Sequence, residues 1–126
     1  MGDLLPIRLN VVALDCRDTK TLSGFYCRML GWRVTFSERD EWIEIEPPEG
    51  GSRIAFQKNE DYVPPVWPEA PGAQQMMAHL DFAVGKDRLS EAAAHAVGCG
   101  AKVAETQYSD HWIVMIDPEG HPFCFV

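Results

Sequence analysis

The hydrophobic and polar positions of the first half follow two different periods. Residues 8–14 carry Val11, Val12 and Leu14 and predict a buried strand. Apolar residues then recur at three- and four-residue spacing, the period of one helix face: Leu22, Phe25, Tyr26, Met29 and Leu30. Three short runs, 32–36, 42–45 and 53–56, predict strands, and a turn rich in proline and glycine over 47–51 separates the last two.

The ends of this first helix carry their own signals. Asp18 is the predicted N-cap, because its carboxylate can accept hydrogen bonds from the free amides of the first turn. Gly31 follows the last apolar position and suits the left-handed conformation in which many helices end. The pattern therefore predicts a βαβββ unit over residues 6–57.

The second half, residues 77–126, repeats this order. Residues 79–84 alternate apolar with polar side chains and predict a strand. Asp87 is the predicted cap of the next helix, and Gly98 or Gly100 its end. The inner stripe of that helix consists of Leu89, Ala92, Ala93, Ala96 and Val97. Residues 102–106, 112–116 and 123–126 predict strands, with the turn Asp117–Gly120 before the last one.

Equivalent positions of the two halves are separated by a nearly constant number of residues. Asp18 and Asp87 differ by 69 positions (87 − 18), and so do Gly31 and Gly100. The turn at Pro48 recurs 70 positions later at Pro118. We interpret this agreement as an internal duplication. The fold class predicted for residues 1–126 is a single α+β domain of two tandem βαβββ units.

A proline-rich crossover, residues 58–76, connects the two units. Proline lacks an amide donor and fixes φ, so the segment is expected to be stiff and extended. It carries two aromatic residues, Tyr62 and Trp67, among Pro64, Pro65, Pro68 and Pro71. Long connections without secondary structure often carry functional residues.

Composition and charge exclude several classes of partner. The chain is 46% hydrophobic and 24% charged, as expected of a globular protein. Its net charge of −8, without a basic patch, disfavours nucleic acid and anionic membrane partners. No apolar run approaches the ~20 residues of a membrane span, and residues 1–9 lack the order of a secretory signal. We therefore expect a cytoplasmic protein with four reduced cysteines.

Motifs in both halves point to a known family. They are Phe25-Tyr26 and Leu30-Gly31-Trp32 in the first half, and His79-Leu80-Asp81-Phe82 and Asp117-Pro118-Glu119-Gly120-His121-Pro122-Phe123 in the second. With them the chain resembles the glyoxalase-like domains of the vicinal oxygen chelate superfamily, which also contains dioxygenases and fosfomycin and bleomycin resistance proteins. The resemblance implies curled mixed sheets around a central cleft, helices on the outside, and a homodimer. This fold hosts many activities.

The resemblance also implies where a metal ion would bind. Metal-dependent members place ligands on the first and last strands of each unit, which here gives Val11, Gln57, His79 and Cys124. Val11 cannot bind a metal, and Cys124 stands where a glutamate is usual. One histidine without that glutamate suits neither a hard divalent ion nor an iron site, and two ligands are too few for zinc. We therefore predict no metal cofactor, with a divalent ion as the alternative.

Each candidate residue has a functional and a structural interpretation. His79 and Asp81 share a strand face and can contact a polar ligand or exchange a proton with it, or form a structural pair. His121 is interpreted first as a turn residue that bonds backbone carbonyls. Cys124, between two phenylalanines, is interpreted as a buried, inert thiol, with nucleophilic catalysis beside His79 as the alternative. Trp67 is expected in the wall of an apolar pocket or against a second subunit.

These expectations combine into one leading hypothesis. The chain is predicted to be a metal-independent, small-molecule binding protein of the glyoxalase/bleomycin resistance type, with a small apolar or aromatic ligand between its halves. Its candidate ligand-binding residues are Gln57, Trp67, His79, Asp81, His121 and Cys124. The alternatives are a metal-dependent lyase, isomerase or dioxygenase with a remodelled site, and an interaction module without a ligand. No catalytic residue is assigned, and the sequence lacks phosphate-loop, dinucleotide-binding, serine-hydrolase and zinc-protease motifs.

Overall fold

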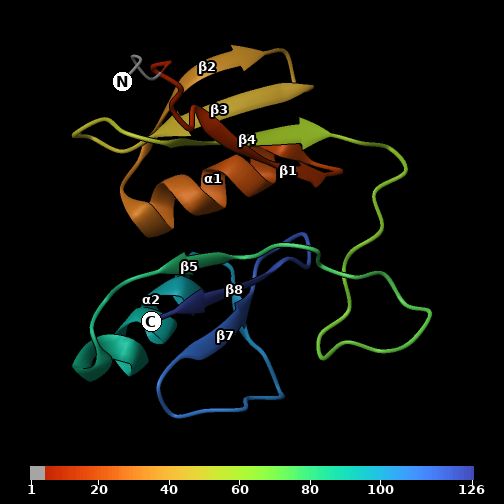
Figure 1. The fold of residues 1–126 in the computed structure, drawn as a ribbon, viewed down its shortest axis with the longest axis vertical. Coiled ribbons are helices and arrows are strands. Elements are labelled where there is room, and N and C mark those ends of the chain that lie inside the picture. The colour runs from red at the N-terminus through yellow and green to blue at the C-terminus, as the bar shows by residue number, and fades with distance from the viewer. Residues whose placement is uncertain (1–4) are drawn as a thin grey trace.

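The computed structural model describes residues 5–126 and shows two similar units, one after the other (Figure 1). Unit one contains β1 (Val11–Cys16), α1 (Thr19–Leu30), β2 (Arg33–Glu38), β3 (Trp42–Glu46) and β4 (Arg53–Lys58). Unit two contains β5 (Leu80–Phe82), the short 3₁₀ helix η1 (Lys86–Arg88), α2 (Leu89–Cys99), β6 (Lys102–Val103), β7 (Ile113–Ile116) and β8 (Pro122–Phe125). The predicted α+β fold of two tandem βαβββ units is confirmed.

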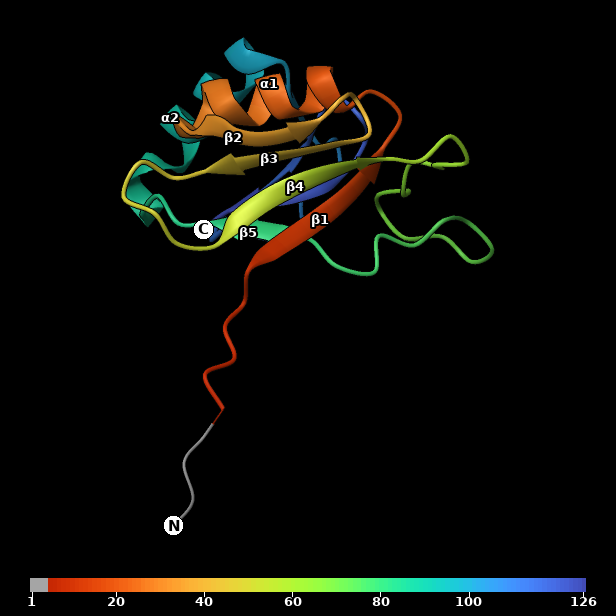
Figure 2. The ribbon, with the colours of Figure 1, turned by 90° about the horizontal axis from the view of Figure 1, so that it is seen from above.

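The two sheets have the same strand order. The first is ordered β1-β4-β3-β2 and the second β5-β8-β7-β6. In each sheet the first and last strands of the unit pair in parallel, and the other pairs are antiparallel. Helices α1 and α2 lie side by side (Figure 2). Such matching connectivity supports the duplication inferred from the sequence.

Helix α1 begins and ends where its capping residues predict. The Asp18 carboxylate accepts a hydrogen bond from the Thr21 amide at 3.0 Å, and Gly31 has the left-handed φ of 71°. Both features satisfy backbone groups that a helix end leaves free. Within residues 5–126, neither α1 nor α2 has the combined length and apolar character that crossing a bilayer requires.

The predicted start of the second helix is wrong by one residue. Asp87 lies within η1, and α2 has Arg88 at its N-cap position without any side-chain capping bond. The cause is Gly85, whose carbonyl accepts the Arg88 amide and closes a 3₁₀ turn ahead of the helix. Of the two predicted ends, Gly100 is the one observed, with its amide bonded to the carbonyls of Ala96 and Val97.

The strand predicted over 102–106 is only two residues long, because a side chain replaces its continuation. The Gln107 amide nitrogen donates to the Val114 carbonyl at 2.8 Å, and the Gln107 side-chain oxygen accepts the Val114 amide at 2.9 Å. The Val114 carbonyl also accepts the Ala104 amide at 3.0 Å, so the bond that a longer β6 would add on β7, and that Gln107 replaces, is the one from the Val114 amide. The chain from Glu105 to Trp112 therefore leaves the sheet.

One hydrophobic core joins the two units, and Tyr26 lies within it. Its ring stacks on Phe56 of the first sheet, with centroids 5.6 Å apart, and meets Phe123 of the second sheet edge-on at 5.9 Å. Phe25 and Tyr26 are both fully buried. The aromatic residues of α1 thus pack against both sheets at once.

A buried carboxylate lies at the edge of this core. Asp117 is 3% exposed and accepts hydrogen bonds from the Tyr26 hydroxyl at 2.8 Å and from the backbone amides of Glu119 and His121. Its fourth partner is the His121 ring, whose Nδ1 lies 2.8 Å from a carboxylate oxygen. A buried charge with this many donors is fully compensated.

The His121 ring connects this carboxylate to unit one. Its Nε2 lies 2.7 Å from the carbonyl oxygen of Asp15 at the end of β1. Two acceptors on opposite ring nitrogens require both nitrogens to carry protons. Burial lowers the pKa of His121, but its hydrogen bond with Asp117 and the Asp117 charge outweigh that effect, so the pKa is raised above its ordinary value.

Replacing Tyr26 by Phe tests the contribution of this buried carboxylate. The variant leaves Asp117 with one donor fewer in a site that water does not reach. We expect the free energy of unfolding to fall by about 1.5–3 kcal/mol, measured by urea denaturation. Tyr108→Phe, at a residue 67% exposed, is the matched control and should leave stability unchanged. Equal losses in the two variants would contradict the role given to the Tyr26 hydroxyl.

The His121 contacts predict a pH dependence of stability. Because the pKa of His121 is raised in the folded protein, its stabilising contribution is complete below about pH 6.5 and is lost as the pH rises through the folded value. The unfolding free energy of the wild type should exceed that of His121→Gln by more at about pH 6 than at about pH 9. Urea denaturation of both proteins at the two pH values measures this. A difference that stays constant, or grows with pH, would refute the charged form of His121.

Candidate functional site

An apolar pocket of about 270 Å³ opens on the second sheet, beside the crossover. Its walls consist of Trp67, Met76, Trp112, Val114, Pro122 and Val126. In the described part of the chain, every lining residue comes from unit two or from the crossover. The structure therefore does not place this pocket between the two halves, where the sequence-based hypothesis expected the ligand.

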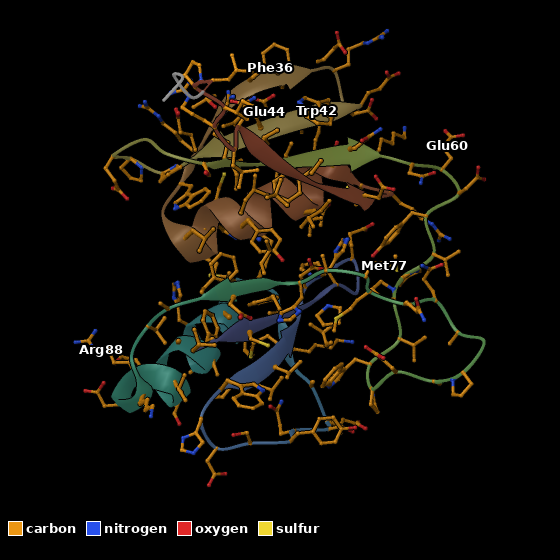
Figure 3. All side chains as sticks on the ribbon, in the orientation of Figure 1. Phe36, Trp42, Glu44, Glu60, Met77 and Arg88 are labelled. Atoms are coloured by element: carbon orange, nitrogen blue, oxygen red, sulfur yellow. The ribbon has the colours of Figure 1, made fainter. Side chains whose placement is uncertain are left out.

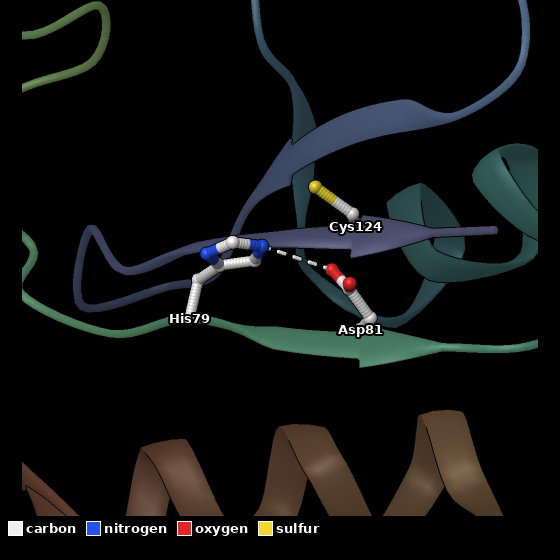
Figure 4. Close-up of side chains that lie close together, drawn as sticks. All are labelled: His79, Asp81 and Cys124. Carbon is white, nitrogen blue, oxygen red and sulfur yellow. Dashed lines mark ion pairs between the residues drawn. The ribbon is translucent and has the colours of Figure 1, made fainter.

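Alternation along two neighbouring strands brings the polar side chains of the pocket together. On β8, Phe123 and Phe125 point into the core, so Cys124 between them faces the pocket. On β5, Leu80 and Phe82 pack against the core and leave Asp81 on the opposite face. Asp81 is paired in register with Cys124. Figure 4 shows the side chains of His79, Asp81 and Cys124 on the face turned away from α1.

His79, Asp81 and Cys124 form a compact polar group at one end of the pocket. His79 Nε2 lies 3.0 Å from Asp81 Oδ1, and the two side chains are 37% and 50% exposed. One donor atom from each of the three residues lies within 4.8 Å of the others. The imidazole and the carboxylate are therefore in direct contact, with no space for a water molecule between these two atoms.

Cys124 is a poor nucleophile in this environment. Burial raises the pKa of its thiol to about 11, and the charge of Asp81 and a hydrogen bond to it act in the same direction. The reactive form of cysteine is the thiolate, which this surrounding disfavours at neutral pH. The interpretation of Cys124 as an inert thiol therefore agrees with its surroundings better than nucleophilic catalysis does.

Trp67 is held in the wall of the pocket by a hydrogen bond and an aromatic contact. Its indole nitrogen donates to the Thr106 carbonyl at 2.9 Å, and its ring meets Tyr108 edge-on with centroids 5.7 Å apart. It also packs against the small cluster that contains Val114 and Cys124. The crossover is thus attached to unit two through this tryptophan.

Two of the six predicted site residues lie elsewhere. Gln57 is exposed on β4 and lines a separate depression with Trp42 and several glutamates. Figure 3 places Trp42 on the first sheet and Met77 at the end of the crossover. His121 belongs to the junction with Asp117 and bonds the Asp15 carbonyl, as its interpretation as a turn residue expected. The other four, Trp67, His79, Asp81 and Cys124, share the pocket.

The pairing register identifies the equivalents of the polar pair in unit one. Core residues Ile54 and Phe56 of β4 correspond to Phe123 and Phe125 of β8. The residues of β1 that pair with the first two therefore correspond to the residues of β5 that pair with the last two. The pair formed by Asp81 and Cys124 therefore has the pair Ala13 and Ala55 as its counterpart. Ala55, rather than Gln57, occupies the position of Cys124. Unit one contributes two methyl groups where unit two contributes a carboxylate and a thiol.

Sequence reasoning missed most of the apolar wall. Trp112 was predicted only as part of the strand 112–116, yet it is 40% exposed and lines the pocket. The signal was its two-residue spacing from Val114, which places both side chains on one face of the strand. Val126, two residues after Cys124 in the predicted strand 123–126, carried the same signal, whereas Met76 lies in the crossover, which has no regular pattern.

The three polar groups can be compared with the needs of a metal ion. An imidazole, a carboxylate and a buried thiol form a mixed nitrogen, oxygen and sulfur set. A hard ion such as Mn²⁺ prefers oxygen and nitrogen ligands, so this set does not fit it. Zinc accepts all three ligand types, and three of them with one open position would suit it. Of the ions that such proteins bind, zinc is therefore the one that this donor set fits.

Comparisons with known proteins agree on the family and leave the activity open. Residues 11–126 match the model of the glyoxalase-like domain, and no curated protein matches the sequence. A glyoxalase/bleomycin resistance protein/dioxygenase family enzyme from Burkholderia phytofirmans PsJN is 23% identical, with a TM-score of 0.69 over 94% of this chain and 97% of that one.

A second structure carries a bound metal. It is a mutant of the fosfomycin resistance protein FosX from Listeria monocytogenes, in complex with Mn(II) and 1S,2S-dihydroxypropylphosphonic acid. It is 11% identical, with a TM-score of 0.70 over 97% of this chain and 90% of that one. At such identities the likeness concerns the fold alone. The family model, which spans 11–126, shows that this chain belongs to the glyoxalase-like domain family.

Proposed function

We propose that the chain is a small-molecule binding protein of the glyoxalase/bleomycin resistance type, and that its ligand occupies the pocket on unit two without a metal ion. The observation that carries this proposal is the pocket itself, which has two tryptophans in its walls and a polar group at one end. Concave apolar sites with a few convergent polar groups are the usual form of ligand sites. A volume of about 270 Å³ indicates a ligand smaller than a typical drug molecule.

The apolar walls contribute binding free energy, and the polar group orients the ligand. Trp67 and Trp112 offer large apolar surfaces, and burying apolar area on binding contributes about 25 cal/mol per Å². His79 and Asp81 contact each other, so neither side chain lacks a polar partner when the pocket is empty. The empty pocket therefore carries no free-energy penalty for an unpaired His79 or Asp81. Neither part of this arrangement needs an ion, which supports binding in the absence of metal.

Titration with 2-naphthol, followed by NMR, tests this proposal on protein treated with a chelator. We expect the indole N–H signals of Trp67 and Trp112 to shift, because both rings line the pocket. The signals of Trp32 and Trp42, which lie in unit one, are the internal controls and should stay in place. Trp112→Leu should weaken binding several-fold through the lost aromatic contact. Shifts at Trp42 instead, or no shift at all, would count against this pocket as the ligand site.

A metal-dependent enzyme is the second candidate, and the close approach of His79, Asp81 and Cys124 favours it. Such an enzyme would be a lyase, isomerase or dioxygenase whose zinc ion is held by these three residues. Zinc would supply a Lewis acid at the polar end of the pocket. The alanine counterparts in unit one cannot add a metal-coordinating atom. The described pocket walls contain no lysine or arginine that could bind a phosphonate like that of the FosX complex.

Metal titration separates the two candidates. For the leading proposal we expect calorimetry of the metal-stripped protein to detect no tight binding of Zn²⁺ or Mn²⁺, and 2-naphthol binding to be unchanged by chelator. One tightly bound zinc per chain, lost in His79→Ala and in Cys124→Ser, would replace the leading proposal by the metal-dependent one. Cys27→Ser is the matched control, because Cys27 does not line the pocket and should leave zinc binding as it is.

A further inference from the structure

We propose that the ligand of the unit-two pocket is a small organic cation, a substituted ammonium group or protonated amine that lies between Trp67, Trp112 and the Asp81 carboxylate. The inference rests on the proposed function, because it concerns the same pocket, and it adds the chemical class of the ligand. It depends on the distribution of charge around the pocket, on the reach of one carboxylate, and on the fixed tryptophan ring.

The charges around the pocket are of one sign. Asp81 is the only carboxylate among the described lining residues, and neither lysine nor arginine is found there. His79 is the only lining group that can acquire a positive charge, and it already faces Asp81. The whole chain carries a net charge of −8, which adds a long-range attraction for cations and a repulsion for anions. An anionic ligand would therefore meet the Asp81 carboxylate and no lysine or arginine side chain among the described lining residues.

The Asp81 carboxylate has capacity left for a ligand. Its contact with His79 involves Oδ1, the Cys124 thiol uses a further acceptor position, and half of the side chain remains exposed. A carboxylate accepts about four hydrogen bonds through its two oxygens. A cation in the pocket can therefore approach the carboxylate while the His79 contact stays in place.

The aromatic walls suit a cation with apolar substituents. The face of an indole ring carries negative electrostatic potential and attracts ammonium groups, most of all when water is excluded. The Trp67 ring is fixed by its bond to Thr106 and its edge-on contact with Tyr108. A ring that is already fixed loses little conformational freedom when a ligand binds. Alkyl groups on the nitrogen would fill the space beside Val114 and Val126.

A pair of probes of equal shape isolates the charge. Choline and 3,3-dimethylbutan-1-ol differ in having nitrogen or carbon at the branched centre, so only choline is a cation. We expect choline to shift the Trp67 and Trp112 indole signals and to bind about tenfold more tightly than the alcohol. Asp81→Asn should remove this preference by weakening choline alone. Asp87→Asn, which removes an equal charge outside the pocket, is the matched control and should retain it.

The failures of this inference and of the proposed function can be told apart. The proposal that the ligand is a cation would be overturned by any of three results: equal affinity of the two probes, tighter binding of the alcohol, or no shift with choline in the millimolar range. Retained 2-naphthol binding would then leave the pocket as a ligand site. An unchanged preference for choline over the alcohol in Asp81→Asn would also overturn the proposal of a cationic ligand. The comparison of probes on the wild type is independent of whether that variant folds.

Discussion

The buried carboxylate of Asp117 is the interaction on which the arrangement of the two units depends. It lies in the turn before β8 and collects donors from α1, from its own turn and from His121, which in turn reaches the end of β1. The helix of one unit and the last turn of the other are thereby fixed to the same two oxygens. Without Asp117, the Tyr26 hydroxyl would be buried between both sheets with no acceptor.

Duplication gave the protein two scaffolds, but only one of them carries a polar site. The two sheets share strand order and register, and corresponding core residues occupy corresponding positions. On the opposite face, Ala13 and Ala55 stand where unit two has Asp81 and Cys124. The crossover adds Trp67 to unit two alone. The packing of the core constrains one face of each sheet, whereas the other face is free to differ between the units.

Much of the fold could be predicted from the sequence because its signals are local. Asp18 and Gly31 act on the backbone beside them, and the apolar period of α1 is uninterrupted. The prediction of Asp87 as the helix cap was wrong, because the sequence of the 3₁₀ turn at Gly85 resembles that of an ordinary helix start. The candidate site was harder to predict. His79, Asp81 and Cys124 follow from strand alternation, but the position of Gln57 depended on a pairing register that only the assembled sheet determines.

The side chain of Gln107 has a consequence for how this site can change in evolution. Because the Gln107 side chain accepts the Val114 amide, that amide does not require a backbone partner from a longer β6. As long as Gln107 is kept, the other residues between Glu105 and Trp112 can change their side chains while the ladder of β7 and β8 stays complete. Tyr108, which touches the pocket wall through Trp67, lies on that segment. Substitutions on this segment can therefore alter ligand selectivity while the strand pairing of the second sheet is retained.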